Sequence, residues 1–355
     1  MQTLNRGLFG PIKDEETGVW GRPEYRCGSC GMRRDTTVTF ARDADGRATV
    51  RGLETCGSPW ACGHCAAKIR AGRAEEIGTI LRLHLEGGGG AVFVTLTNSH
   101  TRDERALAAF EDGMTAWRKM VKTRRWRRLI ERHGVTGFIR VTEVTHSFAN
   151  GWHSHHHIAL LLDKPISFDD FDGGDLEQLR CGVGELWAFQ VTQFGRTVRQ
   201  YYGVTAVIIR DGEGIGNYVS KIELELARSD IQRGRNVSRS AWQIGLDAVT
   251  NGEAVDFALW REYVAATHGR RSISYSRGLC QRYGITEVDD ETLAEETTEA
   301  DTVVVVDGEV FDQIDRASGV AELRQLIEAG AEVYVLVAAV ERQTGRMITV
   351  VDDDG

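Results

Sequence analysis

The sequence lacks any apolar stretch long enough to span a bilayer, and it lacks any internal repeat. A transmembrane helix needs about 20 consecutive apolar residues, so the composition argues against an integral membrane protein. Secretory signal peptides contain an apolar core, which is missing from the first ten residues, MQTLNRGLFG. We therefore expect a cytoplasmic protein with no membrane partner. Its 355 residues, 41% hydrophobic and 27% charged, suit a globular protein with more than one domain.

Cysteine is rare outside one short region of the chain. Five of the seven cysteines fall between residues 27 and 65, and four of them form two Cys-x-x-Cys pairs. In a reducing compartment this clustering favours a metal site over disulfides, and four thiolates in a tetrahedron usually hold structural zinc. A β-hairpin expected between the two pairs can bring them together. The predicted Zn²⁺ ligands are Cys27, Cys30, Cys62 and Cys65, with Cys56 and then His64 as substitutes.

Basic residues are scarce near the end of the chain. Residues 283–355 hold 19 acidic and 4 basic residues, a net charge of −15, whereas the other 282 residues hold 33 acidic and 39 basic residues, a net charge of +6. An acidic tail on a mildly basic body suits a protein that touches a polyanion. A merely solvated acidic tail explains the C-terminal part equally well.

Three histidines alternate along one segment, Trp152-His153-Ser154-His155-His156-His157, which leads into the apolar run 158–162. In an extended strand, residues 153, 155 and 157 share one face, with successive side chains about 6.6 Å apart. Neutral histidine is the commonest metal ligand, and the apolar run predicts a buried strand. The pattern therefore indicates a metal site on a rigid strand, against the alternatives of hydrogen-bonded surface histidines or a leftover tag.

A carboxylate joins these histidines through a hairpin. Asn150-Gly151 is a strong turn signal, and a hairpin through it brings Glu143 beside His155. A site that mixes imidazole and carboxylate ligands with open positions suits Mg²⁺ or Mn²⁺ bound to a phosphate. The predicted ligands of this second metal are His155, His157, His153 and Glu143.

A tyrosine and a lysine are spaced for joint chemistry on a predicted helix, residues 214–227. Tyr218 and Lys221 are separated by three positions and so share one helix face. A tyrosine can form a covalent phosphodiester, and a neighbouring lysine can lower the pKa of that tyrosine or orient the phosphate. The alternative reading of Tyr-x-x-Lys alone, an ordinary exposed helix pair, is strong.

Apolar patterns and turn residues predict the remaining elements. Strands are expected at 91–97, 137–146, 152–162 and 203–210, and helices at 66–85, 103–132, 175–195 and 214–227. This order predicts an α+β fold, an antiparallel sheet with flanking helices of the split βαβ type. The expected parts are an N-terminal segment with the cysteine module (1–66), a main domain (67–281), an acidic linker (282–302) and a small α/β appendage (303–355). Two strands of the appendage are expected on either side of Thr344-Gly345.

Three segments resemble motifs 1, 2 and 3 of the HUH endonucleases that initiate rolling-circle replication of plasmids and phages. In chain order they are Val94-Thr95-Leu96-Thr97, Gly151-Trp152-His153-Ser154-His155-His156-His157 and Tyr218-Val219-Ser220-Lys221. Residues 61–70, 227–235 and 258–263 are similar to the Rep branch of actinobacterial plasmids. Each motif is weak alone, but all of them in this order are specific, and the resemblance covers roughly residues 25–300.

The resemblance implies an HUH core with an N-terminal zinc-ribbon-like module, and site-specific DNA nicking followed by strand transfer. His155 and His157 match the metal-binding pair, and His153 matches a first histidine of this branch. Tyr218 matches the nicking tyrosine, which becomes linked to a 5′-phosphate, and Lys221 matches its partner.

Two departures from the family pattern concern single positions. The residue between the paired histidines is usually hydrophobic, and His156, which stands there, should point to the opposite face. In some family members a glutamate shortly before the tyrosine activates water for termination. Glu213 is a candidate for this role, and Glu225, on roughly the same helix face as Tyr218, is an alternative.

The partners implied are origin DNA, as a single strand or an extruded hairpin, and the host helicase and polymerase. A basic segment, Arg124, Arg125, Trp126, Arg127 and Arg128, is expected to contact phosphates and to stack on bases, unless it is simply a solvated helix face. Two other functions stay open: an HUH transposase or relaxase, and a non-catalytic zinc-ribbon protein that binds DNA.

Overall fold

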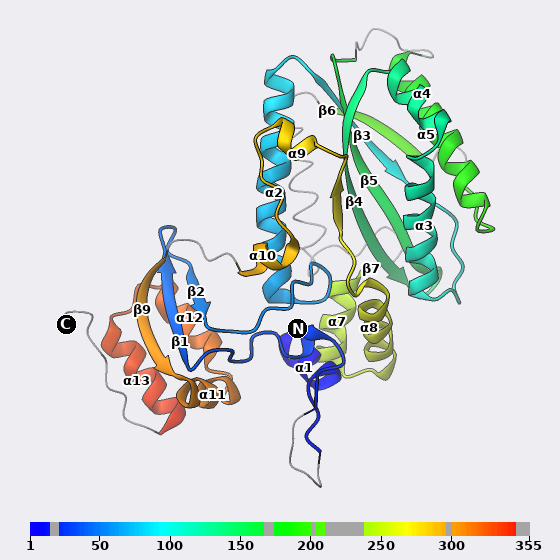
Figure 1. Ribbon diagram of the computed structural model, residues 1–355. Helices are drawn as coiled ribbons and strands as arrows, with labels where there is room; N and C mark the ends of the chain where they lie inside the picture. Colours follow the sequence, from blue (N-terminus) through cyan, green and yellow to red (C-terminus); the bar gives the residue numbers. More distant parts are fainter. Residues whose placement is uncertain (15–20, 167–173, 200–202, 210–237, 296–299, 346–355) are drawn as a thin grey trace. The chain divides into compact units, whose positions relative to one another are not determined.

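The computed structural model describes residues 1–14, 21–166, 174–199, 203–209, 238–295 and 300–345 (Figure 1). The chain divides into two compact units. The first comprises Met1 and Ser58–Leu293, and the second comprises Gln2–Gly57 and Ala294–Gly355. Among the described helices, none combines the length and the apolar character that crossing a bilayer requires.

The first unit is built on a six-stranded antiparallel sheet whose strand order is β6-β3-β5-β4-β7, with β8 also paired to β4. The strands are β3 (Gly90–Leu96), β4 (Val135–Ser147), β5 (Gly151–Leu162), β6 (Val204–Ile209), β7 (Arg239–Ser240) and β8 (Ile273–Tyr275). Gly151 begins β5 with φ +76°, and a Cβ there would lie 2.6 Å from the Thr101 carbonyl oxygen. Glycine is therefore needed at the turn that sets the β4–β5 register.

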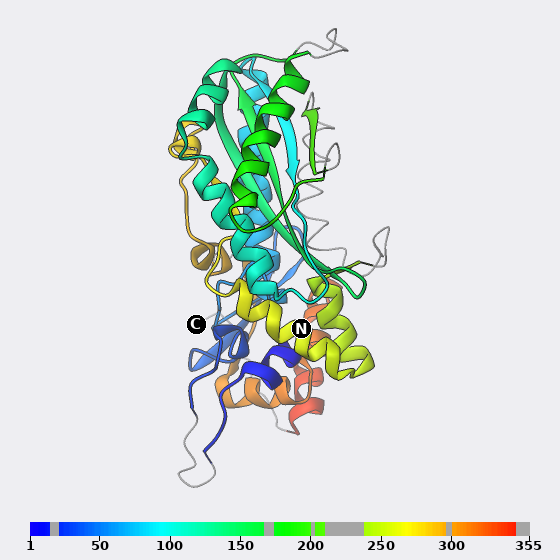
Figure 2. The ribbon, with the colours of Figure 1, turned by 90° about the vertical axis from the view of Figure 1, so that its right-hand side faces the viewer.

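One face of this sheet is covered by three helices: α3 (Ala106–Met120), α4 (Arg124–Arg132) and α5 (Asp175–Thr192). Figure 2, turned so that this side faces the viewer, shows them in front of the strands. The single helix expected over 103–132 is interrupted, because Thr123 is extended and its Oγ1 accepts a hydrogen bond from the Trp126 amide at 3.0 Å. A threonine N-cap of this kind begins a new helix.

The opposite face packs against α2 (Gly63–Glu86) and the short α9 (Leu279–Arg282). Ile77, Ile80 and Leu81 of α2 are fully buried against Ala159 and Leu161 of β5. Apolar side chains on both faces of β5 explain why its sequence ends in a continuous apolar run. The other helices that the structure describes between residues 238 and 295 are α7 (Ala241–Asn251), α8 (Ala254–Thr267) and α10 (Asp290–Glu295).

The second unit joins the two ends of the chain. Its three-stranded antiparallel sheet has the order β2-β1-β9, from β1 (Thr37–Asp43), β2 (Ala48–Arg51) and β9 (Ala300–Asp307). The helices are α1 (Gln2–Phe9), a 3₁₀ turn at Arg26–Gly28, α11 (Gly308–Arg316), α12 (Val320–Glu328) and α13 (Val333–Thr344). Val38 pairs with Val306 and Phe40 with Val304. Strands β1 and β9, from opposite ends of the chain, therefore share one hydrophobic core.

The prediction of a strand before Thr344-Gly345 is wrong, because residues 333–344 form helix α13. Its β-branched residues favour a strand locally. However, Leu336, Ala339 and Val340 are buried at helical spacing in the core of the second unit. Packing of this apolar face outweighs the local preference. The strand expected after Gly345 lies outside the described residues.

Candidate metal centre

The two faces of β5 separate its histidines. Residues 159 and 161 belong to the core beneath α2, so His155 and His157, at the same parity, point to that face. Ile158 and Leu160 belong to the core beneath α3 and α5, and His156 shares their side.

Glu143, His155 and His157 form a compact group at this end of the sheet. The β4–β5 register places Glu143 directly opposite His155. Glu143 Oε2 lies 2.5 Å from His155 Nε2 and 3.3 Å from His157 Nε2. One ligand atom from each of the three residues falls within 4.8 Å of the others, so the group can hold a metal ion.

Contacts behind the group orient the imidazole of His157. Its Nδ1 lies 3.1 Å from Thr95 Oγ1, and its ring stacks on Phe93 with centroids 5.3 Å apart. A hydrogen bond at Nδ1 leaves Nε2 available to a metal, as is usual for metal-bound histidines. The Nδ1 of His155 is buried without a hydrogen-bond partner among the described residues. Two imidazoles and one carboxylate therefore fit a mixed nitrogen and oxygen metal site.

Burial and neighbouring groups shift the pKa values of Glu143 and of the adjacent His153. Burial alone would raise the pKa of Glu143, but the charge and hydrogen bonds of His155 and His157 hold this pKa well below its usual value. Burial, followed by the nearby His155 and His100, lowers the pKa of His153 to about 3. Glu143 is thus an anion and His153 neutral at physiological pH, which are the metal-binding forms of these side chains.

His153 lies beside the group rather than within it. Its ring stacks between His155, at 5.0 Å, and His100, at 4.6 Å. His100 and His153 line a cavity of about 260 Å³ with residues of the β4–β5 turn, among them Asn150. The sequence analysis did not predict that His100 lies beside the metal group. Its position in the polar segment directly after the buried strand 90–96 could have indicated this.

His156 occupies the opposite face, as expected. Its Nδ1 lies 3.0 Å from Thr142 Oγ1, and its ring packs edge-on against Trp187 at 5.6 Å. Burial, with a smaller effect of Arg140, holds the pKa of His156 well below its ordinary value. It is a neutral core residue.

A second group of ligands consists of buried cysteines. The sulfur atoms of Cys30, Cys56, Cys62 and Cys65 lie within 4.8 Å of one another, an arrangement that can bind zinc. Cys62 is the N-cap of α2, and its Sγ accepts a hydrogen bond from the Cys65 amide at 3.5 Å. Cys27 is buried but is not a member of this group, and Cys56, expected as a substitute, stands in its place.

This chain is similar in sequence to curated proteins of Streptomyces. The chain is 30% identical over 318 residues to "Protein rep" of Streptomyces lividans, and the match covers 71% of this chain and 70% of that protein. The chain belongs to the Rep family. A "Neomycin resistance protein" of Streptomyces cyanogenus is 35% identical to this Rep family member over 156 residues, 37% of the chain and 36% of that protein. No family model and no solved structure matches.

Several residues predicted for catalysis in this Rep family member fall outside the described part of the chain. They are Glu213, Tyr218, Lys221 and Glu225, all within 210–237. That these four residues lie close to Glu143, His155 and His157 therefore stays a prediction.

The basic segment forms helix α4, where Arg124, Arg125, Arg127 and Arg128 are exposed. Trp126 differs, because it is only 3% exposed and packs against Trp117 and Phe138. Stacking of this indole on a nucleobase would require it to leave the core, so the predicted base contact of Trp126 is wrong. Trp126, a single apolar residue among arginines, forms the buried side of the amphipathic helix α4.

Proposed function

We propose that this Rep family member initiates rolling-circle replication of a plasmid by nicking one strand of its origin DNA. The observation that carries the proposal is the Glu143, His155 and His157 group, held on two adjacent strands by a tight hairpin. The proposal draws further support from the relative named "Protein rep" and from the order of the three HUH-like motifs. We assign the nicking activity to residues 67–281, which contain the whole six-stranded sheet.

In this proposal Glu143, His155 and His157 hold Mg²⁺ or Mn²⁺, with His153 beside them. The metal supplies Lewis-acid polarisation of the scissile phosphate. Thr95 and Phe93 keep the His157 ring in place, so that its Nε2 faces the same point as the Glu143 carboxylate. The two paired strands thus hold the three ligands close together, and metal binding would replace the direct contact between Glu143 and His155.

The nucleophile in this proposal is Tyr218. Its oxygen attacks phosphorus and loses its proton, the bond from phosphorus to the 3′ oxygen breaks, and that oxygen takes up a proton. The products are a 5′-phosphotyrosine link and a free 3′-OH, which a host polymerase extends after a helicase separates the strands. Lys221 orients the phosphate or lowers the tyrosine pKa, and Glu213 or Glu225 serves the terminating step.

The experiment is a nicking assay on DNA that carries the origin of the encoding replicon. The Tyr218→Phe variant should lose both cleavage and the covalent adduct, because phenylalanine has no nucleophilic oxygen, while it keeps DNA binding. A denaturing gel detects the adduct as a shifted protein band. An undiminished adduct in Tyr218→Phe would overturn the assignment, and no adduct in the parent protein would favour non-catalytic DNA binding.

We also propose that the cysteine group binds structural zinc. Metal analysis of protein purified without chelator should find about one zinc per chain, as expected of a four-cysteine site. Cys65→Ser should lose this zinc, whereas Cys27→Ser should keep it because Cys27 lies outside the group. Protein without zinc would reject the site, and loss of zinc in Cys27→Ser would restore Cys27 as a ligand.

A further inference from the structure

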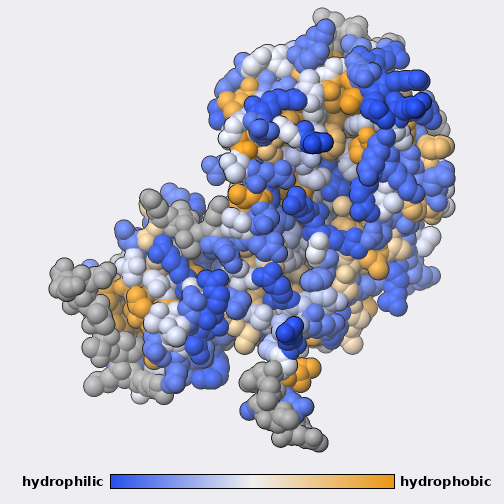
Figure 3. Space-filling model, in the orientation of Figure 1, coloured by the Kyte–Doolittle hydropathy of each residue, from blue (hydrophilic) through white to orange (hydrophobic). Residues whose placement is uncertain are grey.

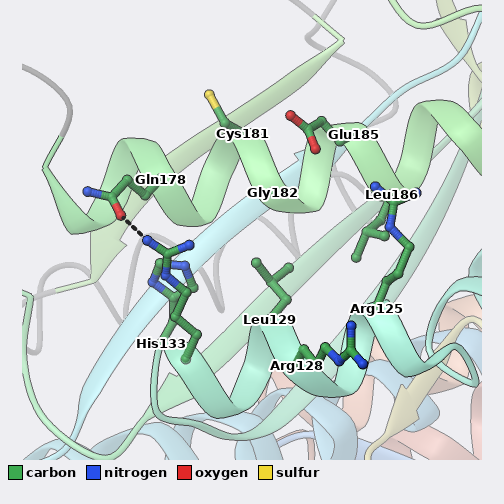
Figure 4. Close-up of a pocket in the computed structure, with 10 residues that line it drawn as sticks. Arg125, Arg128, Leu129, His133, Gln178, Cys181, Gly182, Glu185 and Leu186 are labelled. Carbon is green, nitrogen blue, oxygen red and sulfur yellow. Dashed lines mark hydrogen bonds between the residues drawn. The ribbon is translucent and has the colours of Figure 1, made fainter.

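A groove of about 680 Å³ lies between helices α4 and α5, on the face of the sheet away from Glu143, His155 and His157 (Figure 4). Its floor forms where the two helices approach closely. A Cβ added to Gly182 of α5 would lie 2.5 Å from Leu129 Cδ1 of α4. Glycine at this position therefore lets α4 approach α5 and leaves the arginines of α4 along the rim.

The groove has an excess of positive charge. Arg125, Arg128 and Arg132 recur at helical spacing on its α4 side, and Glu185 is its one acidic residue within the described chain. The described residues give none of these three arginines an ion pair. Arg132 Nη2 donates a hydrogen bond to Gln178 Oε1 at 3.0 Å, drawn as a dashed line in Figure 4. In the space-filling view, strongly hydrophilic side chains gather over α4 (Figure 3).

Guanidinium groups that have no ion pair among the described residues and recur along one helix face suit an extended polyanion. Arginine recognises phosphate oxygens through its planar fork of donors. Proteins that bind single strands add aromatic side chains on which the bases stack. The described lining of this groove contains no Trp, Tyr or Phe, and Trp126 of the same helix is buried. The chemistry therefore favours contact with the backbone of a duplex over contact with unpaired bases.

The sheet decides where on the DNA this contact falls. Glu143, His155 and His157 lie on the α2 face, whereas α4 and α5 cover the other face. A nucleotide at the metal group cannot also reach the groove through the sheet. We propose that the α4–α5 groove binds the phosphate backbone of duplex DNA beside the nicked segment. This inference rests on the proposed function, because it assumes that DNA also occupies the α2 face.

Binding of a mixed-sequence duplex, followed by fluorescence anisotropy over a range of KCl concentrations, tests the groove. The variant carrying Arg125→Gln, Arg128→Gln and Arg132→Gln should bind the duplex about 10-fold or more weakly at physiological salt. The slope of log K against log salt should fall by about 2–3, because each lost phosphate contact removes nearly one released counterion. Binding of a single strand should change less.

A matched control removes the same charge elsewhere. Arg42, Arg47 and Arg316 are exposed, belong to the second unit and lie outside the groove, and their combined change to glutamine should leave the salt slope near that of the parent. Circular dichroism melting shows whether each variant folds. An unchanged slope in the groove variant, an equal loss in the control, or a loss confined to the single strand would overturn the proposal. Anisotropy needs no cleavage, so a parent protein that binds but never nicks would reject the proposed function and still test the groove.

Discussion

His156 and His157 are neighbours on β5, yet they lie on opposite faces of the sheet in different chemical surroundings. On the α2 face, His157 meets the Glu143 carboxylate, the Thr95 hydroxyl and the imidazole of His155. On the α3–α5 face, His156 is buried against Thr142 and Trp187. One step along a strand thus separates a candidate ligand from a core residue, because successive side chains alternate between faces.

The largest expected effect is on the nicking rate, and it follows from replacing His157 while His156 is kept. His157→Ala should slow nicking by about 10²–10³-fold, because a lost ligand forfeits several kcal/mol of stabilisation at the phosphate and about 1.4 kcal/mol corresponds to a tenfold change in rate. The measurement is the nicking rate as a function of Mn²⁺ concentration.

The matched change on the other face is His156→Gln. It should leave the nicking rate near that of the parent and lower the free energy of unfolding by about 1–3 kcal/mol, because it disturbs a buried hydrogen bond. Equal losses of nicking in His156→Gln and His157→Ala would break the comparison, as would cleavage that persists in EDTA.

The two cores on either side of β5 should contribute similarly to stability. Leu160 packs beneath α3 and α5, Leu161 beneath α2, and both are almost completely buried. Leu160→Ala and Leu161→Ala should each lower the free energy of unfolding by about 2–5 kcal/mol, the usual cost of such a cavity. Urea denaturation measures both. A substantial loss in only one variant would show that a single helix layer stabilises the sheet.

The smallest expected effect concerns pH and belongs to the α2 face. Burial, followed by the charge of Glu76 and a 2.6 Å hydrogen bond to its Oε2, raises the pKa of Tyr275 above its ordinary value. The unfolded chain therefore ionises this tyrosine at a lower pH than the folded chain does. Its contribution is complete below about pH 10, the ordinary tyrosine value, and is lost as the pH rises further.

Tyr275→Phe should accordingly cost about 1 kcal/mol at neutral pH and flatten the alkaline decline in the free energy of unfolding. Urea denaturation between neutral and alkaline pH, with Phe93→Leu as a control on the same face, measures the difference. If the parent and Tyr275→Phe decline in parallel above pH 10, Tyr275 is not the responsible group.

Local patterns in the sequence predicted the elements around the metal group correctly. Alternation over 153–157, the turn at Asn150-Gly151 and the apolar runs of β3 and β5 are short-range signals, so they indicate strands, register and faces directly. The opposite orientation of His156 follows from the same alternation. His100 was missed because it reaches His153 through a loop that has no periodic pattern.

Long-range packing decided what these patterns left open. Cys56 joins Cys30, Cys62 and Cys65 because the path of the chain, and not its spacing, sets which sulfur atoms meet. Helix α13 forms from a strand-like run because its apolar face completes a core. Trp126 is buried for the same reason, although its charged neighbours suggested a binding surface.

By itself, the sequence determined the alternating histidines, the hairpin that sets Glu143 opposite His155, and the two strands that this hairpin joins, because each depends on residues close together in the chain. Only the tertiary structure decided that β1 and β9 share one sheet, that α4 and α5 border a groove, and that this groove and the metal group lie on opposite faces. Those features depend on contacts between distant segments, where burial of apolar surface outweighs local preference.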